Sequence, residues 1–502
     1  MISIKPNHLS TYEIKNEEKG MSKIFNRREF LKISAAGSAL CLAGPKLFSG
    51  GTRQESIKLL SPGCRGTKVK LAKIYMGVPD PHWPKPTLDL EKEIRFYESR
   101  FAEYKKELSD VDFVVNRLVS SPEQVEKLKD NLKDVDGILA IHLTIWIGNI
   151  LDALLEQGKP TVVFAAPYSG HEWVGYGDLL RQEKGSRMEC LLTSDYSRLE
   201  WAIRPFRAIH HLREAKILNL TTRDFSDYAA TMEAKFGTEI KRIELDRMLK
   251  TYDAVSDVEA QAETIRWIKG AEKVVEPSKT DIFHSCKLAL AFEKLLDEEE
   301  ATVMTVDCYG TMWDKTIKLP AYPCVGFGRL NDMGLGGICE SDLRSAMTHI
   351  LFQGLTGKPG FISDPTVDEG KGHIILAHCL GTPKMDGPDK AAHSYKLRTI
   401  MERQEGVVPQ VKMREGQRVT QALLMGEDLI HYFTGEIAET LIDLEHDRGC
   451  RTKIAVKVDG DLSKLWRNWS HGLHRQTVYG DITKELRYFC KFKGIGLVNE
   501  AI

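Results

Sequence analysis

The sequence has no paired cysteines and no excess of charge of either sign. Its ten cysteines stand singly, with no Cys-x-x-Cys pair, which excludes a zinc ribbon and a small disulfide scaffold and predicts that most are core thiols. Lysine and arginine number 70 against 71 aspartates and glutamates. Because no long basic stripe interrupts this balance, we do not expect nucleic acid as a partner. Internal repeats and low-complexity tracts are also absent.

Long apolar runs are lacking too, apart from a short one near the amino terminus. Residues 26–45 read NRREFLKISAAGSALCLAGP, a twin-arginine pair before a short apolar stretch, which is typical of a bacterial Tat export signal. The stretch is much shorter than the roughly 20 residues of a spanning helix. We therefore expect no stable membrane insertion and a periplasmic or extracellular protein. Met21 is an alternative start, which would make residues 1–20 an extension.

With 502 residues the chain is too long for one core, and two or three domains are expected. From residue 68 onward, short β-branched runs alternate with helical stretches, which predicts βαβ units and parallel sheets buried on both faces. After residue 406 the segments are shorter and more strand-like, as in an antiparallel barrel or sheet. We predict a signal and extension at 1–51, α/β domains at 52–186 and 187–300, and a catalytic domain at 301–502.

Four residues in the last third stand at the ends of predicted elements. Glu340 opens an amphipathic helix, and Asp364 ends the apolar strand that follows it. His378 closes the next strand, and His471 lies in Ser-His-Gly. Two carboxylates and two imidazoles form an oxygen and nitrogen ligand set for one divalent metal, and the carboxylates can also move protons. The pattern therefore indicates an enzyme.

Each of these residues alone has a simpler interpretation. An acidic residue at a helix start often serves only the helix dipole, and an aspartate before proline is common in turns. A lone histidine at a strand end is more often a core residue, and His471 and His474 could both lie on the surface. Among other candidates, a solvated helical face is much more probable than a metal site for His210, His211 and Glu214.

Other motifs carry weaker indications. The glycines of GFGRLNDMGLGG do not have the G-x-G-x-x-G order, so we reject dinucleotide binding. Trp173 follows the fourth predicted strand, where α/β domains present ligand contacts, and an aromatic ring there could stack on a sugar. We expect Cys379 to serve packing. The acidic and imidazole side chains at 445–447 are expected to make a polar turn.

Order and spacing make the four candidate ligands more convincing together than singly. From about residue 303 to 498 the chain resembles the L-fucose isomerase and L-arabinose isomerase family. The matching pieces are CESD around Glu340, SDP at Asp364, AHC at His378, and NWSHGLHRQTVYGDITKEL around His471. Before this stretch only the architecture is similar.

The resemblance implies two Rossmann-like α/β domains followed by an α+β catalytic domain with a β-barrel-like part. Glu340 and Asp364 would be the metal-binding acid/base pair, His471 the next ligand, and His378 the histidine that the arabinose branch adds. The metal would be Mn²⁺, with Mg²⁺ or Co²⁺ as substitutes. A homo-oligomer, trimer or hexamer, is implied because family members place the active site where one subunit's amino-terminal domain meets another's catalytic domain.

Two departures leave the substrate unassigned. Asp364 is the fucose-type residue, whereas its spacing to His471 is nearer that of the arabinose branch. The predicted function is a metal-dependent aldose–ketose isomerase that acts on a monosaccharide or sugar derivative through an enediol. The alternatives are a metal-dependent epimerase or lyase on a modified sugar, and a non-catalytic exported sugar-binding protein.

Overall fold

The computed structural model describes residues 57–170, 173–308, 310, 313, 316–442, 448–470 and 472–502. The predicted export signal, His471 and the predicted polar turn at 445–447 lie outside the described residues.

The first sheet has five parallel strands in the order β2-β1-β3-β4-β5. Every residue of β3 and β4 is buried, as expected for a parallel sheet that is covered on both faces. Neighbouring residues of one strand enter different cores: Leu139 joins one apolar cluster and Ile138 the other. The strands are β1 (Val69–Met76), β2 (Val111–Val119), β3 (Gly137–His142), β4 (Thr161–Ala165) and β5 (Met188–Leu192).

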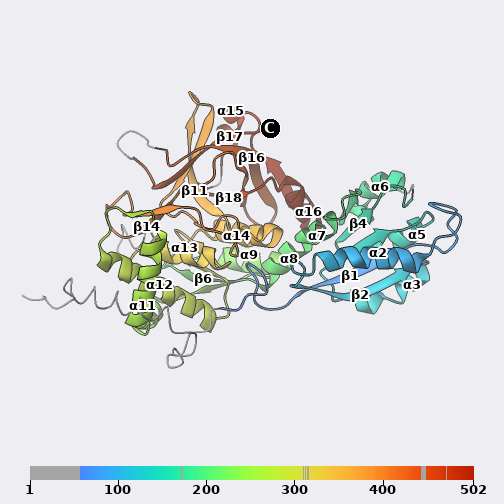
Figure 1. The fold of residues 1–502 in the computed structure, drawn as a ribbon, viewed down its shortest axis with the longest axis horizontal. Helices are drawn as coiled ribbons and strands as arrows, with labels where there is room; N and C mark the ends of the chain where they lie inside the picture. The colour runs from blue at the N-terminus through green and yellow to red at the C-terminus, as the bar shows by residue number, and fades with distance from the viewer. Residues whose placement is uncertain are drawn as a thin grey trace, which may run out of the picture. The chain divides into compact units, whose positions relative to one another are not determined.

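Short helices connect these strands and lie alongside them (Figure 1). They are α2 (Leu90–Glu103), α3 (Pro122–Glu126), α4 (Lys129–Leu132), α5 (Gly148–Leu155), α6 (Trp173–Leu180) and the 3₁₀ turn η1 (Glu183–Gly185).

The second sheet is also parallel, with four strands in the order β10-β9-β6-β7. The chain moves from β6 to β7 on one side and later adds β9 on the other side of β6, so the strand order reverses between β6 and β9. Such a switch point is where open parallel sheets bind ligands, at the carboxyl ends of the strands. The strands are β6 (Lys216–Leu220), β7 (Glu239–Arg242), β9 (Val303–Val306) and β10 (Gly336–Ile338).

Several helices among the described residues belong to this region of the chain. Helix α12 is the longest, and it begins with a reciprocal capping box between Ser278 and Asp281, which satisfies the free N–H groups of its first turn. The helices are α7 (Arg198–Trp201), α8 (Arg204–Glu214), α9 (Ser226–Phe236), α10 (Leu245–Asp253), α11 (Asp257–Gly270), α12 (Lys279–Glu298), α13 (Cys324–Asp332) and α14 (Leu343–Thr356).

Six antiparallel strands form a closed barrel in the order β15-β18-β11-β12-β17-β16, with β16 pairing back to β15. They lie in the orange and red part of Figure 1. The barrel strands are β11 (Phe361–Asp368), β12 (His373–His378), β15 (Arg418–Leu424), β16 (Leu429–Thr440), β17 (Thr452–Val458) and β18 (Arg475–Tyr479).

Smaller elements complete the chain. Strand β19 adds to β16 in parallel, and β14, β13 and β8 form a separate three-stranded sheet. They are β8 (Lys273–Val274), β13 (Tyr395–Arg398), β14 (Val408–Val411), α15 (Leu462–Asn468), α16 (Thr483–Lys493) and β19 (Gly496–Asn499). Within the part of the chain that the structure describes, no helix has the length and apolarity needed to cross a bilayer.

The predicted mixed α/β class with parallel sheets is confirmed, and the expected barrel-like part is a closed six-stranded barrel. The sheets extend past the residues at which the domains were divided. Strand β5 lies just after residue 186 yet pairs with β4, and β9 and β10 lie after residue 300 yet pair with each other and with β6.

Candidate metal centre

Glu340 stands in a strained turn at the edge of the second sheet. It follows β10, three residues before α14 begins at Leu343, so it precedes the helix that it was expected to open. Both Glu340 and Ser341 have left-handed backbones, with φ of 64° and 52°. Such conformations cost about 1–3 kcal/mol each and persist only where the surroundings impose them.

Three contacts hold this turn. Ser341 donates its N–H to the Val306 carbonyl at 3.0 Å and its hydroxyl to Asn219 at 2.7 Å. Arg223 donates to the Glu340 carbonyl at 2.8 Å. The preceding glycines allow close approach of the backbone: a Cβ at Gly337 would lie 2.3 Å from the Cα of Phe327.

Asp364 lies within β11, which continues past it to Asp368 instead of ending there. Pairing with β18 stops at Ser363, whereas pairing with β12 continues through Pro365 to Asp368. Ser363 pairs with Arg475, and Asp364 pairs with Ala377. Asp364 is therefore next to His474, which precedes β18, and near the end of β12.

Two buried histidines complete the group. His378 is the last residue of β12 and is 4% exposed, and His474 is 7% exposed. Their ring centroids are 5.5 Å apart. Leu380 donates its N–H to His378 Nδ1 at 3.4 Å, so ligation through Nε2 requires the ring proton to move to Nδ1 and this long hydrogen bond to be lost.

The ligand atoms of Glu340, His378 and His474 all lie within 4.8 Å of one another. Glu340 Oε1 is 3.7 Å from His378 Nε2, and its Oε2 is 3.6 Å from His474 Nε2. Asp364 Oδ1 joins at 3.1 Å from His474 Nε2. Neighbouring ligands of an octahedral ion with bonds of about 2.1 Å lie about 3 Å apart, so a small inward movement would bring these atoms to bonding distance.

Two buried atoms of the group have no hydrogen bond. Asp364 Oδ1 and His474 Nε2 are 3.1 Å apart, but neither makes an aligned hydrogen bond to the other or to another described residue. Buried polar atoms are almost always paired. A carboxylate oxygen and an imidazole nitrogen without hydrogen bonds, beside the second carboxylate of Glu340, fit a divalent cation. The oxygen and nitrogen set suits Mn²⁺, Mg²⁺ or Co²⁺ better than a thiophilic ion.

Asp342 fixes the orientation of His474 from behind. Its Oδ2 accepts a hydrogen bond from His474 Nδ1 at 3.0 Å, which turns Nε2 toward Glu340 and Asp364. Its Oδ1 caps α14 by accepting from the Ser345 N–H at 3.0 Å. Burial by itself would lower the pKa of His474, but contacts with Asp342 and Asp364 and the charge of Glu340 raise it to about 10. The carboxylates therefore favour positive charge at this point.

A cavity of about 450 Å³ adjoins the group at the carboxyl ends of β6 and β10. Its lining residues are Asn219, Thr221, Arg223, Asp224, Phe225, Tyr228, Glu340, Ser341, Asp342, Leu343, Arg344, Leu423, Gly472 and His474. The volume and mixed lining are those of a small-molecule site.

Tyr228 is the most informative cavity residue. It lies on α9, and its hydroxyl is buried with no hydrogen-bond partner among the described residues. Burial and the charge of Asp342 raise the pKa of this phenol, so it stays protonated and can donate. A buried hydroxyl without a partner in the wall of a cavity fits a ligand that supplies the partner.

The structure thus brings Glu340, Asp364 and His378 together, while His471 lies outside the described residues. The surface interpretation of His474 is wrong, because it is buried among the carboxylates. Sequence reasoning missed Asp342 and Tyr228. The signal for His474 was available: it comes directly before the strand RQTVY, just as His378 ends another strand.

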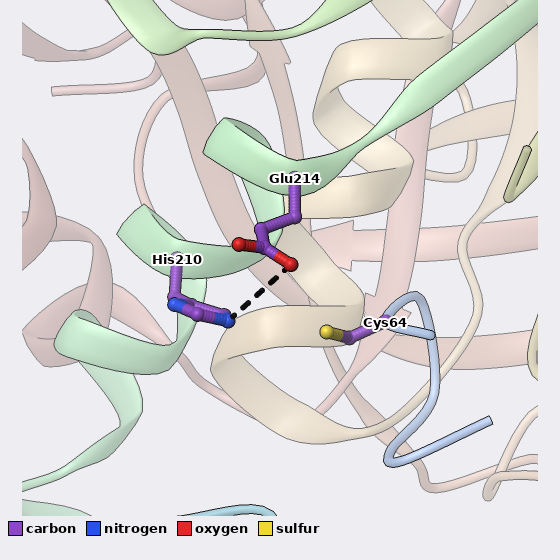
Figure 2. A group of neighbouring side chains, drawn as sticks. All are labelled: Cys64, His210 and Glu214. Carbon is purple, nitrogen blue, oxygen red and sulfur yellow. Dashed lines mark ion pairs between the residues drawn. The ribbon is translucent and has the colours of Figure 1, made fainter. Parts of the chain in front are cut away.

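The solvated-face interpretation of His210 and His211 is also wrong, because both are buried. Figure 2 shows His210 and Glu214 one turn apart on α8, with Cys64 on a facing loop. His210 Nδ1 lies 3.0 Å from Asp136, and Nε2 lies 2.8 Å from the Thr67 carbonyl. Burial opposes its charge, but the Asp136 hydrogen bond raises the pKa of His210 to about 10. The Thr67 carbonyl can only accept, so it occupies the proton on Nε2, whereas the neighbours of His474 Nε2 are carboxylates that can share a metal with it. We therefore assign the His210 group to an ion pair with Asp136.

Trp173, proposed to stack on a sugar, begins α6 and is 56% exposed. Trp146 and Tyr168, which follow β3 and β4, are also exposed. These aromatic rings lie after the strands of the first sheet and do not line the cavity beside Glu340.

The sequence matches no protein-family model and no curated protein.

Proposed function

We propose that the protein is a metal-dependent aldose–ketose isomerase that acts on a monosaccharide or sugar derivative through an enediol. The observation that carries the proposal is the convergence of Glu340, Asp364, His378 and His474 beside a cavity of about 450 Å³. Mn²⁺ is the expected ion, with Mg²⁺ or Co²⁺ as substitutes. When bound, it would hold neighbouring carbonyl and hydroxyl oxygens and stabilise the enediolate.

The proton transfers are assigned to the two carboxylates. Isomerisation removes the proton from the carbon beside the carbonyl and returns one to the neighbouring carbon. Glu340 and Asp364 both approach His474 Nε2, at 3.6 and 3.1 Å, so they border one point from different elements. In this proposal one carboxylate accepts the proton and the other moves protons between the oxygens.

The finer arrangement follows the family resemblance. We propose two Rossmann-like α/β domains before an α+β catalytic domain, Tat export to the periplasm or outside the cell, and assembly as a trimer or hexamer. The exposed rings of Trp146, Tyr168 and Trp173 would then be available to stack on a sugar in a neighbouring subunit's site.

A second candidate is a metal-dependent epimerase or lyase that acts on an acidic sugar. The observation in its favour is that the guanidinium-bearing residues Arg223 and Arg344 line the cavity. Arg223 is 59% exposed and already pairs with Asp307 at 2.8 Å. Arginine is well suited to binding carboxylate or phosphate.

The test combines metal analysis with hydrogen exchange. Purified protein would be analysed for bound metal, then incubated with candidate aldoses and ketoses in D₂O while NMR follows deuterium entry beside the carbonyl. We expect about one Mn²⁺ per chain, and exchange that disappears in Glu340→Gln. Glu436→Gln, an exposed barrel carboxylate, is the matched control. Exchange on an acidic sugar without ketose formation would favour the second candidate, and absence of metal and exchange would refute both.

A further inference from the structure

A second group of ligand-type side chains begins at the residue directly after His378. Cys379, Glu402 and Cys450 place their ligand atoms within 4.8 Å of one another. The Glu402 carboxylate accepts from the Cys379 thiol at 3.3 Å and from the Cys450 thiol at 3.5 Å. We propose that these three residues form a second metal site, for Zn²⁺ or another thiophilic ion, separate from the site at Glu340.

The spacing agrees with tetrahedral coordination. Zinc bonds of about 2.3 Å to sulfur and about 2.0 Å to oxygen place a sulfur and an oxygen ligand about 3.5 Å apart, and two sulfurs about 3.8 Å apart. Both sulfurs lie near this distance from the same oxygen: Glu402 Oε1 is 3.7 Å from Cys379 Sγ and 3.5 Å from Cys450 Sγ. The two sulfurs, within 4.8 Å, need to approach only slightly.

The backbone brings the ligands together from three ordered segments. His378 pairs with Thr452 across β12 and β17, so Cys379 and Cys450 lie at neighbouring ends of adjacent strands. Glu402 lies in a turn closed by the hydrogen bond from the Ile400 N–H to the Glu405 carbonyl, at 3.0 Å.

The chemistry of the group favours a metal over a salt bridge. Among the described residues no lysine, arginine or histidine pairs with Glu402, so the partners of its carboxylate are the two thiols. Thiols are weak hydrogen-bond donors. A metal ion would replace both weak bonds with coordination, and the two thiol protons would pass to solvent. Two sulfurs select zinc over manganese.

Metal binding at this second site would affect the first site because the two sites have neighbouring residues in the chain. Cys379 directly follows His378 at the end of β12, and a metal that joins it to β17 and to the turn of Glu402 would hold that strand end. The second ion is therefore a structural brace, and its loss is expected to loosen His378 without removing a ligand of the first site.

Cadmium titration of the reduced full-length protein tests this proposal, because thiolate-to-cadmium charge transfer absorbs in the ultraviolet and an oxygen and nitrogen site gives no such band. We expect a band that saturates at about one Cd²⁺ per chain and is lost in Cys379→Ser and Cys450→Ser. Glu402 is exposed, so Glu402→Gln should fold normally and weaken binding by more than the roughly 10–100-fold typical of losing an outer-shell partner.

Two controls separate this site from other binding. Cys190→Ser removes a partly buried thiol elsewhere and should keep the band. Glu340→Gln should also keep it, so the proposal does not depend on the isomerase assignment. A band that survives both cysteine substitutions would overturn the proposal. A native protein lighter by two hydrogens, with these two cysteines joined in one peptide, would overturn it in favour of a disulfide.

Discussion

Asp342 offers a test of how the candidate centre is organised, because it has two separable roles. One oxygen accepts from His474 Nδ1 and the other caps α14. Asparagine is as good an N-cap as aspartate, but it lacks the negative charge that supports His474. Asp342→Asn should therefore preserve the helix cap and weaken the metal site, whereas Asp342→Ala should weaken both the helix cap and the metal site.

The expected magnitude for metal binding follows from a competition. Asp342 favours both a proton and a metal on His474, since it raises the pKa of that ring. A divalent ion feels twice the potential that a proton does, so loss of the charge reduces metal affinity more than proton affinity. Loss of an outer-shell partner costs about 10–100-fold in affinity, which is about 1.4–2.8 kcal/mol. The substitution also weakens the competing binding of a proton to His474, which offsets part of this loss. We therefore expect metal affinity to fall about tenfold at neutral pH.

Metal affinity by chelator competition and stability by urea unfolding of the metal-free protein provide the two readouts. Asp342→Asn should lose metal affinity and, in the metal-free protein, only the stability that the contact between His474 and the Asp342 charge contributes. Asp342→Ala should lose about 1 kcal/mol more, for the cap. Asp461→Ala removes the exposed N-cap of α15 and should lose stability only. Wild-type metal affinity in Asp342→Asn would refute the orienting role.

Three further predictions concern the cavity, a buried ion pair and the turn. Tyr228→Phe removes the unpartnered hydroxyl, so stability should not fall, whereas KM for the responding sugar should rise with little change in kcat. His210 has a folded pKa of about 10 because its hydrogen bond to Asp136 outweighs burial. Its contribution to stability should be complete below its ordinary pKa of about 6.5 and lost as pH rises through about 10, so the stability difference from His210→Gln should shrink over that range. Gly337→Ala places a Cβ 2.3 Å from the Phe327 Cα, and calorimetry should show destabilisation of at least about 1–3 kcal/mol.

The local sequence was sufficient to predict a strand where the strand's own residues show how it is buried. The parallel strands β3 and β4 were predicted because uninterrupted apolar runs are buried on both faces. The three-residue strand β10 could not be predicted from Gly-Gly-Ile, because it exists through pairing with β9. The membership of that strand in the second sheet, and the left-handed turn at Glu340 that follows it, depend on this distant pairing.

The site was predictable to the extent that its ligands end strands. His378 was found by that rule and Glu340 by its place before a helix. His474, which directly precedes a strand, would have been found if RQTVY had been recognised as one. Asp342 could be recognised as a helix cap but not as a partner of His474, because a cap pattern does not reveal what the second carboxylate oxygen contacts. The burial of His210 depends on Asp136, which is far away in the sequence.

The contacts that hold Glu340 also connect metal binding to substrate binding. The left-handed residues Glu340 and Ser341 are kept in place by Arg223 and Asn219, and both of these side chains also line the cavity. A ligand that drew Arg223 toward itself would weaken its bond to the Glu340 carbonyl and change the position of the carboxylate. The factor by which the ligand changes the affinity for metal must then equal the factor by which metal changes the affinity for the ligand. The strained turn is the element that couples the two sites.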